Sequence, residues 1–236
     1  MPYSDRYVAF IDILGFSDII RKTAHDDNPA RYNAILQVLT EIKSLGSGPG
    51  NAFEFQSFSD SIVLSSDVTA DGLTSLVRAI EVLAIHMLVN GLLLRGGVAK
   101  GKLHHAQDVM FGPAFLDAYR IESQIAKYPR VVLSREVYQN FNTLPQKAGI
   151  PQVQLADDGP PYLDVLASLN DPARYASHRS TCQQMLQGLL DDSIHEPRHY
   201  EKLRWLAIYW NGTVALGDPV SRIELPLARA ALRRAD

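Results

Sequence analysis

Residues 10–17 read Phe-Ile-Asp-Ile-Leu-Gly-Phe-Ser and end an apolar run that begins at Tyr7. This run predicts a buried strand over residues 7–13. Asp12 stands near the end of that strand, where a carboxylate is costly to bury without a partner, and a metal ion is a common partner. Gly15 permits a tight turn that directs backbone N–H groups at an anion. The stretch therefore predicts a site for metal and phosphate.

The composition is that of an ordinary globular protein, with 236 residues, 46% hydrophobic and 21% charged, and a net charge of −3. This charge disfavours a broad nucleic-acid-binding surface. A single cysteine, Cys182, excludes an intramolecular disulfide, as suits a reducing cytosol. The N-terminal residues lack the pattern of a signal peptide, and the apolar run 83–94 is interrupted by polar residues and glycine. We expect a cytoplasmic protein with no membrane and no nucleic-acid partner.

The rest of the chain alternates strand and helix patterns. Strands are expected over residues 52–58, 61–65, 92–102, 107–111 and 130–133, and helices over 28–45, 70–89, 112–126, 172–190 and 197–211. The pair His104-His105 is expected to form the solvated turn of the second hairpin. The element order predicts an α+β fold of the ferredoxin-like type, an antiparallel-rich sheet with helices on one face and a C-terminal helical extension.

A second carboxylate, Asp60, is expected in the turn between the strands 52–58 and 61–65. In a ferredoxin-like sheet the first strand is central and this hairpin can be its neighbour, so Asp12 and Asp60 would lie side by side. Two adjacent carboxylates repel unless cations lie between them, which is typical of two-metal phosphoryl-transfer sites. Each residue also has a simpler interpretation, Asp60 as a turn residue and Asp12 as a buried aspartate that caps local backbone.

The chain resembles the class III nucleotidyl cyclases over about residues 7–138. Residues 10–17 match the family's first motif, Phe-x-Asp-Ile-x-Gly-Phe-Thr/Ser, at every defined position. Two later motifs, Arg-x-Gly-x-x-x-Gly and Gly-x-x-x-Asn-x-Ala-x-Arg-x-Glu, are met by Arg95, Gly97 and Gly101 and by Gly112, Ala118, Arg120 and Glu122. The resemblance implies a cyclase catalytic core over residues 1–143, and an extension over 144–236 that packs on the core or at a dimer interface.

The chain departs from the family where the family reads a purine. The asparagine of the third motif falls on Leu116, and the lysine and aspartate that read adenine fall on Gln56 and Val109. The metal residues are kept. This combination looks like the bacterial pyrimidine cyclases of Pycsar antiphage systems, which implies UTP before CTP as substrate. Gln56 can offer a uracil or cytosine edge both a donor and an acceptor.

The resemblance implies conversion of a nucleoside triphosphate to its 3′,5′-cyclic monophosphate and pyrophosphate. Asp12, Asp60 and the backbone carbonyl of Ile13 would hold two Mg²⁺ or Mn²⁺ ions. The β- and γ-phosphates would lie against the stretch of Ile13, Leu14, Gly15, Phe16 and Ser17. Arg120 would face the α-phosphate from the other subunit, which implies a homodimer with composite sites. Arg95 is also expected at the nucleotide.

Other interpretations use the same residues. Arg120 could be a surface arginine paired with Asp117 or Glu122. A haloacid-dehalogenase-type phosphatase needs a second aspartate where Leu14 stands, and a diguanylate cyclase needs a Gly-Gly-Asp/Glu-Glu-Phe hairpin that is absent. The remaining alternative is a catalytically silent cyclase-like domain that binds nucleotide as a sensor. Leu116 favours this alternative, whereas the kept carboxylates and Arg120 argue against it.

Overall fold

The computed structural model describes residues 3–16, 53–106, 109–145 and 149–226, together with short pieces between residues 20 and 43. The described pieces between 20 and 43 are helical. The rest of the helix expected over residues 28–45 lies outside the described residues.

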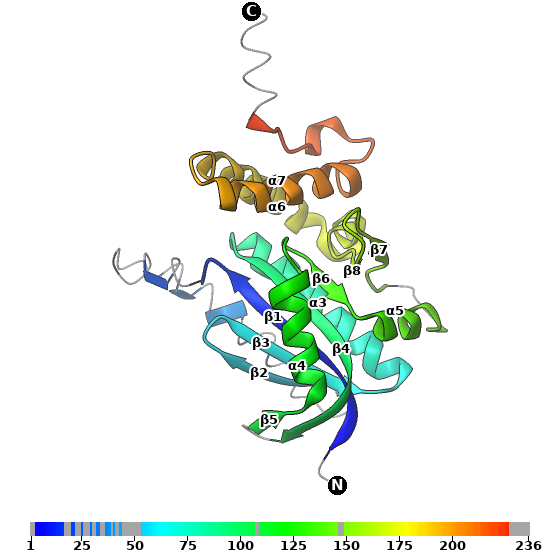
Figure 1. Ribbon diagram of the computed structural model, residues 1–236. Coiled ribbons are helices and arrows are strands. Elements are labelled where there is room, and N and C mark those ends of the chain that lie inside the picture. The colour runs from blue at the N-terminus through cyan, green and yellow to red at the C-terminus, as the bar shows by residue number, and fades with distance from the viewer. Residues whose placement is uncertain are drawn as a thin grey trace, which may run out of the picture.

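Strand β1 (Ser4–Leu14) is the centre of the sheet and runs antiparallel to both of its neighbours, β3 (Ser61–Asp67) and β4 (Leu93–Ala106) (Figure 1). β2 (Phe53–Phe58) pairs with the outer side of β3, and helix α3 (Ala70–Val89) leads from β3 to β4. The resulting order β2-β3-β1-β4 is that of a ferredoxin-like sheet. The predicted α+β class and antiparallel-rich sheet are confirmed.

The sheet continues beyond β4 through three short strands. β6 (Val131–Leu133) runs parallel to β4, and β8 (Pro161–Leu163) and β7 (Val153–Leu155) follow antiparallel. Helix α5 (Arg135–Asn142) comes between β6 and β7 along the chain. The sequence patterns did not predict α5, β7 or β8.

Helices cover both faces of the sheet, so the expectation of helices on one face was wrong. Alternate residues of β1 face opposite sides because side chains of a strand alternate. Ala9 and Ile11 pack in a cluster with α3, whereas Val8 and Phe10 pack with helix α4 (Pro113–Arg120). α4 continues as a π-helix over Ile121–Ile125, within the helix expected over 112–126.

The second hairpin turns later than expected. β4 runs through both histidines to Ala106, and His104 and His105 pair with Phe111 and Met110 of β5 (Val109–Phe111). The prediction of a solvated turn at these histidines was wrong, because the side chain of His105 is only 3% exposed.

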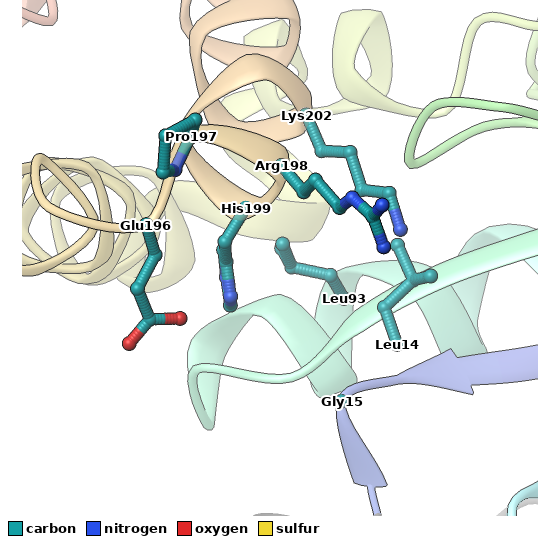
Figure 2. Close-up of a pocket in the computed structure, with 8 residues that line it drawn as sticks. All are labelled: Leu14, Gly15, Leu93, Glu196, Pro197, Arg198, His199 and Lys202. Carbon is teal, nitrogen blue, oxygen red and sulfur yellow. The ribbon is translucent and has the colours of Figure 1, made fainter.

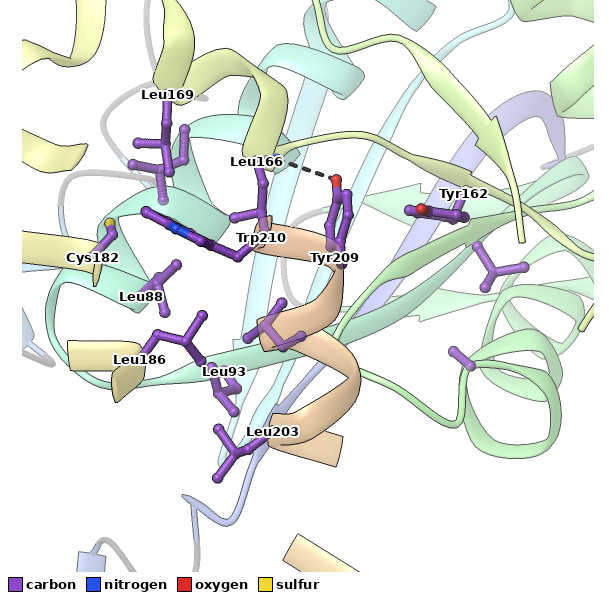
Figure 3. Packing of buried hydrophobic residues seen from close by; sticks show 14 of the residues in the cluster. Leu88, Leu93, Tyr162, Leu166, Leu169, Cys182, Leu186, Leu203, Tyr209 and Trp210 are labelled. Atoms are coloured by element: carbon purple, nitrogen blue, oxygen red, sulfur yellow. Dashed lines mark hydrogen bonds between the residues drawn. The ribbon is translucent and has the colours of Figure 1, made fainter. Parts of the chain in front are cut away.

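Two long helices, α6 (Pro172–Asp192) and α7 (Pro197–Thr213), follow β8 and lie at one end of the sheet (Figure 1). A short 3-10 helix, η3 (Pro219–Ser221), comes after α7. The start of α7 lies over the end of β1, where Lys202 and Leu14 line a common pocket (Figure 2). The two helices share a core with α3 and β4 that contains the fully buried Trp210 (Figure 3). Cys182 is buried in this core, and burial raises the pKa of its thiol to about 12. The domain boundary at residue 143 stays a prediction.

Helix α3 is the one described helix that is long and apolar enough to cross a membrane, with a mean hydropathy of 1.6 over its best 18 residues. In the fold, 61% of that window is buried. α3 packs against the sheet on one side, and the carboxylate of Glu81 on its α6 side lies 3.0 Å from the guanidinium of Arg174. These contacts are those of a core helix.

Candidate active site

The two predicted carboxylates lie at the same end of the sheet. Asp12, near the end of β1, stands opposite Ser61 of β3 and Arg95 of β4. Asp60 belongs to the turn that precedes β3, and its backbone carbonyl accepts a hydrogen bond of 3.0 Å from the backbone N–H of Ile13. This hydrogen bond ties the β2–β3 turn to the end of β1 and so brings Asp60 next to Asp12.

The turn itself has an unusual backbone. Phe58 pairs with Ser61, so that Ser59 and Asp60 form a two-residue turn. Ser59 has a φ of +56° and is the one described residue other than glycine with a positive φ. This conformation favours glycine because a Cβ crowds the following carbonyl. The sequence therefore keeps a strained residue beside Asp60.

Arg95 bridges two carboxylates at this end of the sheet. Its Nε atom lies 3.2 Å from Oδ2 of Asp12 and 2.6 Å from Oε1 of Glu122. The side chain of Glu122 is 4% exposed and lies on the π-helical turn that follows α4. The sequence motif included Glu122 but assigned it no role. The structure makes it the second partner of Arg95.

Burial and mutual repulsion act on both carboxylates. Burial raises the pKa of Asp12, Arg95 opposes this rise, and the charge of Asp60 adds to it. Burial likewise raises the pKa of Glu122, which Arg95 opposes and Asp12 and Asp60 increase. The negative charges of Asp12, Asp60 and Glu122 therefore repel one another, and the single positive charge of Arg95 does not neutralise them fully.

The donor set fits a hard divalent cation. Two carboxylates and a backbone carbonyl are oxygen ligands of the kind that Mg²⁺ and Mn²⁺ prefer. The raised pKa of Asp12 marks a carboxylate whose negative charge is incompletely compensated, and a cation would relieve it. Over the described ranges, no group of three or more His, Cys, Asp or Glu side chains is already arranged as a metal site.

The turn after β1 has the backbone that the sequence predicted. Gly15 has a φ of +71° and is exposed, and Leu14 and Phe16 on either side of it are half-buried. A Cβ built on Gly15 would meet no atom within 4 Å, so its positive φ alone explains the glycine. Ser17 lies outside the described residues.

Two other predicted site residues, Gln56 and Arg120, lie apart from the cluster around Asp12 when a single chain is considered. Gln56 is half-buried on the edge strand β2, opposite Val63. The side chain of Arg120 is 62% exposed on α4, and its nearest acidic partner is Asp117 at 3.6 Å. This is the simpler pairing considered for Arg120, and a role in a partner's site stays a prediction.

A second polar cluster occupies the opposite end of the same sheet face. Arg6 of β1 donates to Glu54 (2.8 Å), to Ser65 (3.1 Å) and to Asp67 (2.6 Å). The Ser65 hydroxyl and His105 Nδ1 are 2.7 Å apart. Sequence reasoning missed this cluster because its members are far apart along the chain and meet only through the strand register.

No protein-family model matches the chain, and no curated protein matches it in sequence. Solved structures of similar fold include a bacterial light-regulated adenylyl cyclase, at 14% identity and a TM-score of 0.46, with 78% of this chain and 98% of that chain covered. An adenylate/guanylate cyclase/hydrolase from Silicibacter pomeroyi is 14% identical with a TM-score of 0.44, covering 68% and 95%. An adenylate cyclase from Trypanosoma brucei is 14% identical with a TM-score of 0.45, covering 70% and 91%. At these values the likenesses assign neither a family nor an activity to this chain.

Proposed function

We propose that this chain is a nucleotide cyclase of the pyrimidine type. It converts UTP, or CTP as the second choice, to the 3′,5′-cyclic monophosphate and pyrophosphate. The cyclic product serves as a second messenger in antiphage defence in the cytoplasm. The proposal combines the resemblance of residues 10–17 to the cyclase motif with the arrangement of side chains around Asp12.

One observation carries the proposal: Asp12 and Asp60 meet at the end of the central strand. They stand beside the exposed Gly15 turn, and the hydrogen bond from Ile13 to Asp60 fixes their proximity. A pair of close carboxylates next to an anion-binding turn suits a triphosphate and its divalent cations. A protein that only needed a stable strand end has no use for two repelling acids.

The reaction makes one P–O bond and breaks another. The ribose 3′-oxygen attacks the α-phosphorus, its proton leaves to solvent, and the bond between the α-phosphorus and the bridging oxygen breaks to release pyrophosphate. Asp12, Asp60 and the carbonyl of Ile13 would hold two Mg²⁺ or Mn²⁺ ions, which supply charge neutralisation and a lowered pKa of the attacking hydroxyl. The backbone of residues 13–17 receives the terminal phosphates.

The chain's own cations complete the site. Arg120 stabilises charge at the α-phosphate of a site shared with a partner subunit, so the active form is a homodimer. Its 62% exposure on α4 supports this assignment because an exposed arginine can reach another chain. Arg95 holds Asp12 and Glu122 in place next to the nucleotide.

The proposed preference for a pyrimidine base rests on Gln56 and Val109, which stand where the family has the residues that bind adenine. Gln56 offers an amide on β2, and Val109 offers no charge at the start of β5. An amide can pair with the edge of either uracil or cytosine by rotating about its last bond. UTP is placed first on the resemblance to uridylate cyclases.

A second function is a catalytically silent nucleotide-binding sensor. Two observations favour it: Arg95 already occupies one oxygen of Asp12, and Leu116, which replaces a polar residue of the motif, is 64% exposed. A sensor would bind nucleoside triphosphate without releasing pyrophosphate.

A turnover assay with each of the four nucleoside triphosphates and Mn²⁺, with products separated by chromatography, tests the proposal. We expect cyclic UMP and pyrophosphate from the wild-type protein, and none from Asp12→Asn or Asp60→Asn. Asp5→Asn is the matched control, since Asp5 lies on the same strand in an exposed pair with Lys102. Product from ATP or GTP alone would contradict the pyrimidine assignment, and binding without product would support the sensor.

A further inference from the structure

A pocket with a volume of about 550 Å³ lies between the end of β1 and the start of α7 (Figure 2). Leu14, Gly15 and Leu93 form its floor, and Arg198, His199 and Lys202 of α7 form its wall. A volume of this size is in the range of small-molecule sites. The pocket therefore joins the start of α7 to the phosphate end of the proposed active site.

The wall of the pocket is basic. The ends of the Arg198 and Lys202 side chains point toward Leu14, whereas the carboxylate of Glu196 points away from them (Figure 2). Within the described part of the chain, neither Arg198 nor Lys202 has an acidic partner within 4.0 Å. Two permanent cations that share a pocket without a described counter-ion suit an anionic ligand.

The pocket is electrostatically continuous with the carboxylate site. Gly15 is three residues after Asp12, and it lines the pocket together with Lys202. Burial raises the pKa of Asp12, and the charge of Lys202 is among those that oppose this rise. A ligand that spans both sites would contact the carboxylates and any metal ions they hold at one end, and Arg198 and Lys202 at the other.

We propose that Arg198, His199 and Lys202 bind the terminal phosphates of the nucleoside triphosphate and hold the pyrophosphate that it releases. This inference rests on the proposed function, because it takes the triphosphate to lie along residues 13–17. Arginine can bind a phosphate through two parallel N–H···O bonds, and lysine contributes a point charge. Helix α7 then acts in the site itself, in addition to packing on the core.

Calorimetric titration with pyrophosphate, with inorganic phosphate as the comparison probe, tests the pocket without requiring turnover. We expect the wild-type chain to bind pyrophosphate, and Arg198→Ala and Lys202→Ala each to bind it about tenfold or more weakly, as loss of a charge-assisted hydrogen bond implies. Arg204→Ala is the matched control, because Arg204 is an exposed arginine of α7 that does not line the pocket. Lys202→Arg should restore most of the affinity.

The same variants separate this inference from the proposed function. If the wild-type protein makes no cyclic nucleotide but loses pyrophosphate binding on Lys202→Ala, the pocket assignment stands and the cyclase proposal fails. If the protein is an active cyclase and both alanine variants keep the wild-type KM and pyrophosphate affinity, the pocket assignment is overturned. Absence of pyrophosphate binding to the wild-type chain also overturns it.

Discussion

At the scale of single residues, Ser59 has a strained backbone conformation in a turn that positions the carboxylate of Asp60. Its φ of +56° costs an L-residue about 1–2 kcal/mol, whereas glycine adopts it freely. The turn is held because the next residue, Asp60, accepts the hydrogen bond from Ile13. Position 59 thus serves to aim its neighbour.

Ser59→Gly should stabilise the protein by about 0.5–1 kcal/mol, since relief of the strain exceeds the added entropy of the unfolded chain. Urea denaturation measures the change. Ser57→Gly, within the strand β2, is the control and should destabilise, because glycine weakens a strand. A less stable Ser59→Gly protein would show that the serine side chain contributes more than its backbone costs.

Residue patterns predicted the two aspartates, and a motif placed Arg95 at the nucleotide, but they did not predict the ion pairs of Arg95 with Asp12 and Glu122. Asp12 follows an apolar run and Asp60 a hairpin signal, so both places could be inferred from local sequence. The ion pairs of Arg95 depend on the register of β4 against β1 and on the π-helical turn that carries Glu122. Neither the register nor the π-helix has a local sequence signal, so these contacts required the structure.

At the scale of secondary-structure elements, the close approach of α4 to β4 positions Glu122. A Cβ added to Gly97 would lie 2.5 Å from the carbonyl oxygen of Ala118 and 2.6 Å from Cβ of Ile121. Only glycine permits this distance. The motif glycine therefore sets how near the π-helical turn comes to Arg95.

Gly97→Ala should destabilise the protein by about 1–3 kcal/mol through overpacking, and should weaken the Arg95–Glu122 pair. Chemical denaturation and the activity assay report the two effects. Gly101→Ala is the matched control in the same strand, because its Cβ would meet Ala114 at an ordinary 3.5 Å. Equal stability losses in the two variants would contradict the steric explanation.

The cluster around His105 should make the stability of the fold sensitive to pH. Burial lowers the pKa of His105, with Glu54 opposing this and Arg6 and His104 adding to it. Below pH 6.5 the unfolded chain takes up a proton that folded His105 does not. The free energy of unfolding should therefore fall as the pH falls from 6.5 toward the lowered pKa.

Denaturation curves of wild type and His105→Gln between pH 7.5 and 5 check this expectation. The variant has no proton to take up at this position, so its stability should change less over that range. His195→Gln, at an exposed histidine, should keep the wild-type slope. Parallel slopes for His105→Gln and wild type would exclude His105 as the source.

Strands β1 to β6 and the helices α3, α4, α6 and α7 were predicted from the sequence, but α5, β7 and β8 were not. β1 and α3 carry long apolar patterns, and α6 and α7 each open with a proline. β7 and β8 have three residues each and lie in or beside a stretch punctuated by proline and glycine, so they show no period. The prediction of a turn at His104 and His105 was wrong because it could not include a contact between residues distant in sequence. Ser65, distant in sequence, gives His105 a buried partner that keeps it in β4.

At the scale of the whole molecule, the proposed composite site makes a prediction about mixed dimers. Asp12→Asn and Arg120→Ala proteins should each be inactive, but their co-expression should restore roughly a quarter of wild-type activity. Half of the dimers are then mixed, and each mixed dimer has one intact site.

The control pair is Asp12→Asn with Asp60→Asn. Both carboxylates belong to one chain's half of the site, since Ile13 binds the backbone of Asp60 within that chain. No mixed dimer of this pair has an intact site, so activity should stay absent. Activity restored by the control pair, or absent from the first pair, would contradict a shared site.

The docking of α7 on the core has a spectroscopic consequence. The sequence has two tryptophans, Trp205 and Trp210, and both belong to α7. The ring of Trp205 stacks on the ring of Tyr128 with their centroids 5.1 Å apart, and Trp210 is fully buried. Intrinsic tryptophan emission of this protein is therefore a natural reporter of one helix, whose first turns form the basic wall of the pocket. The binding of an anion at the basic wall can therefore be followed by tryptophan emission, without a dye or an introduced label.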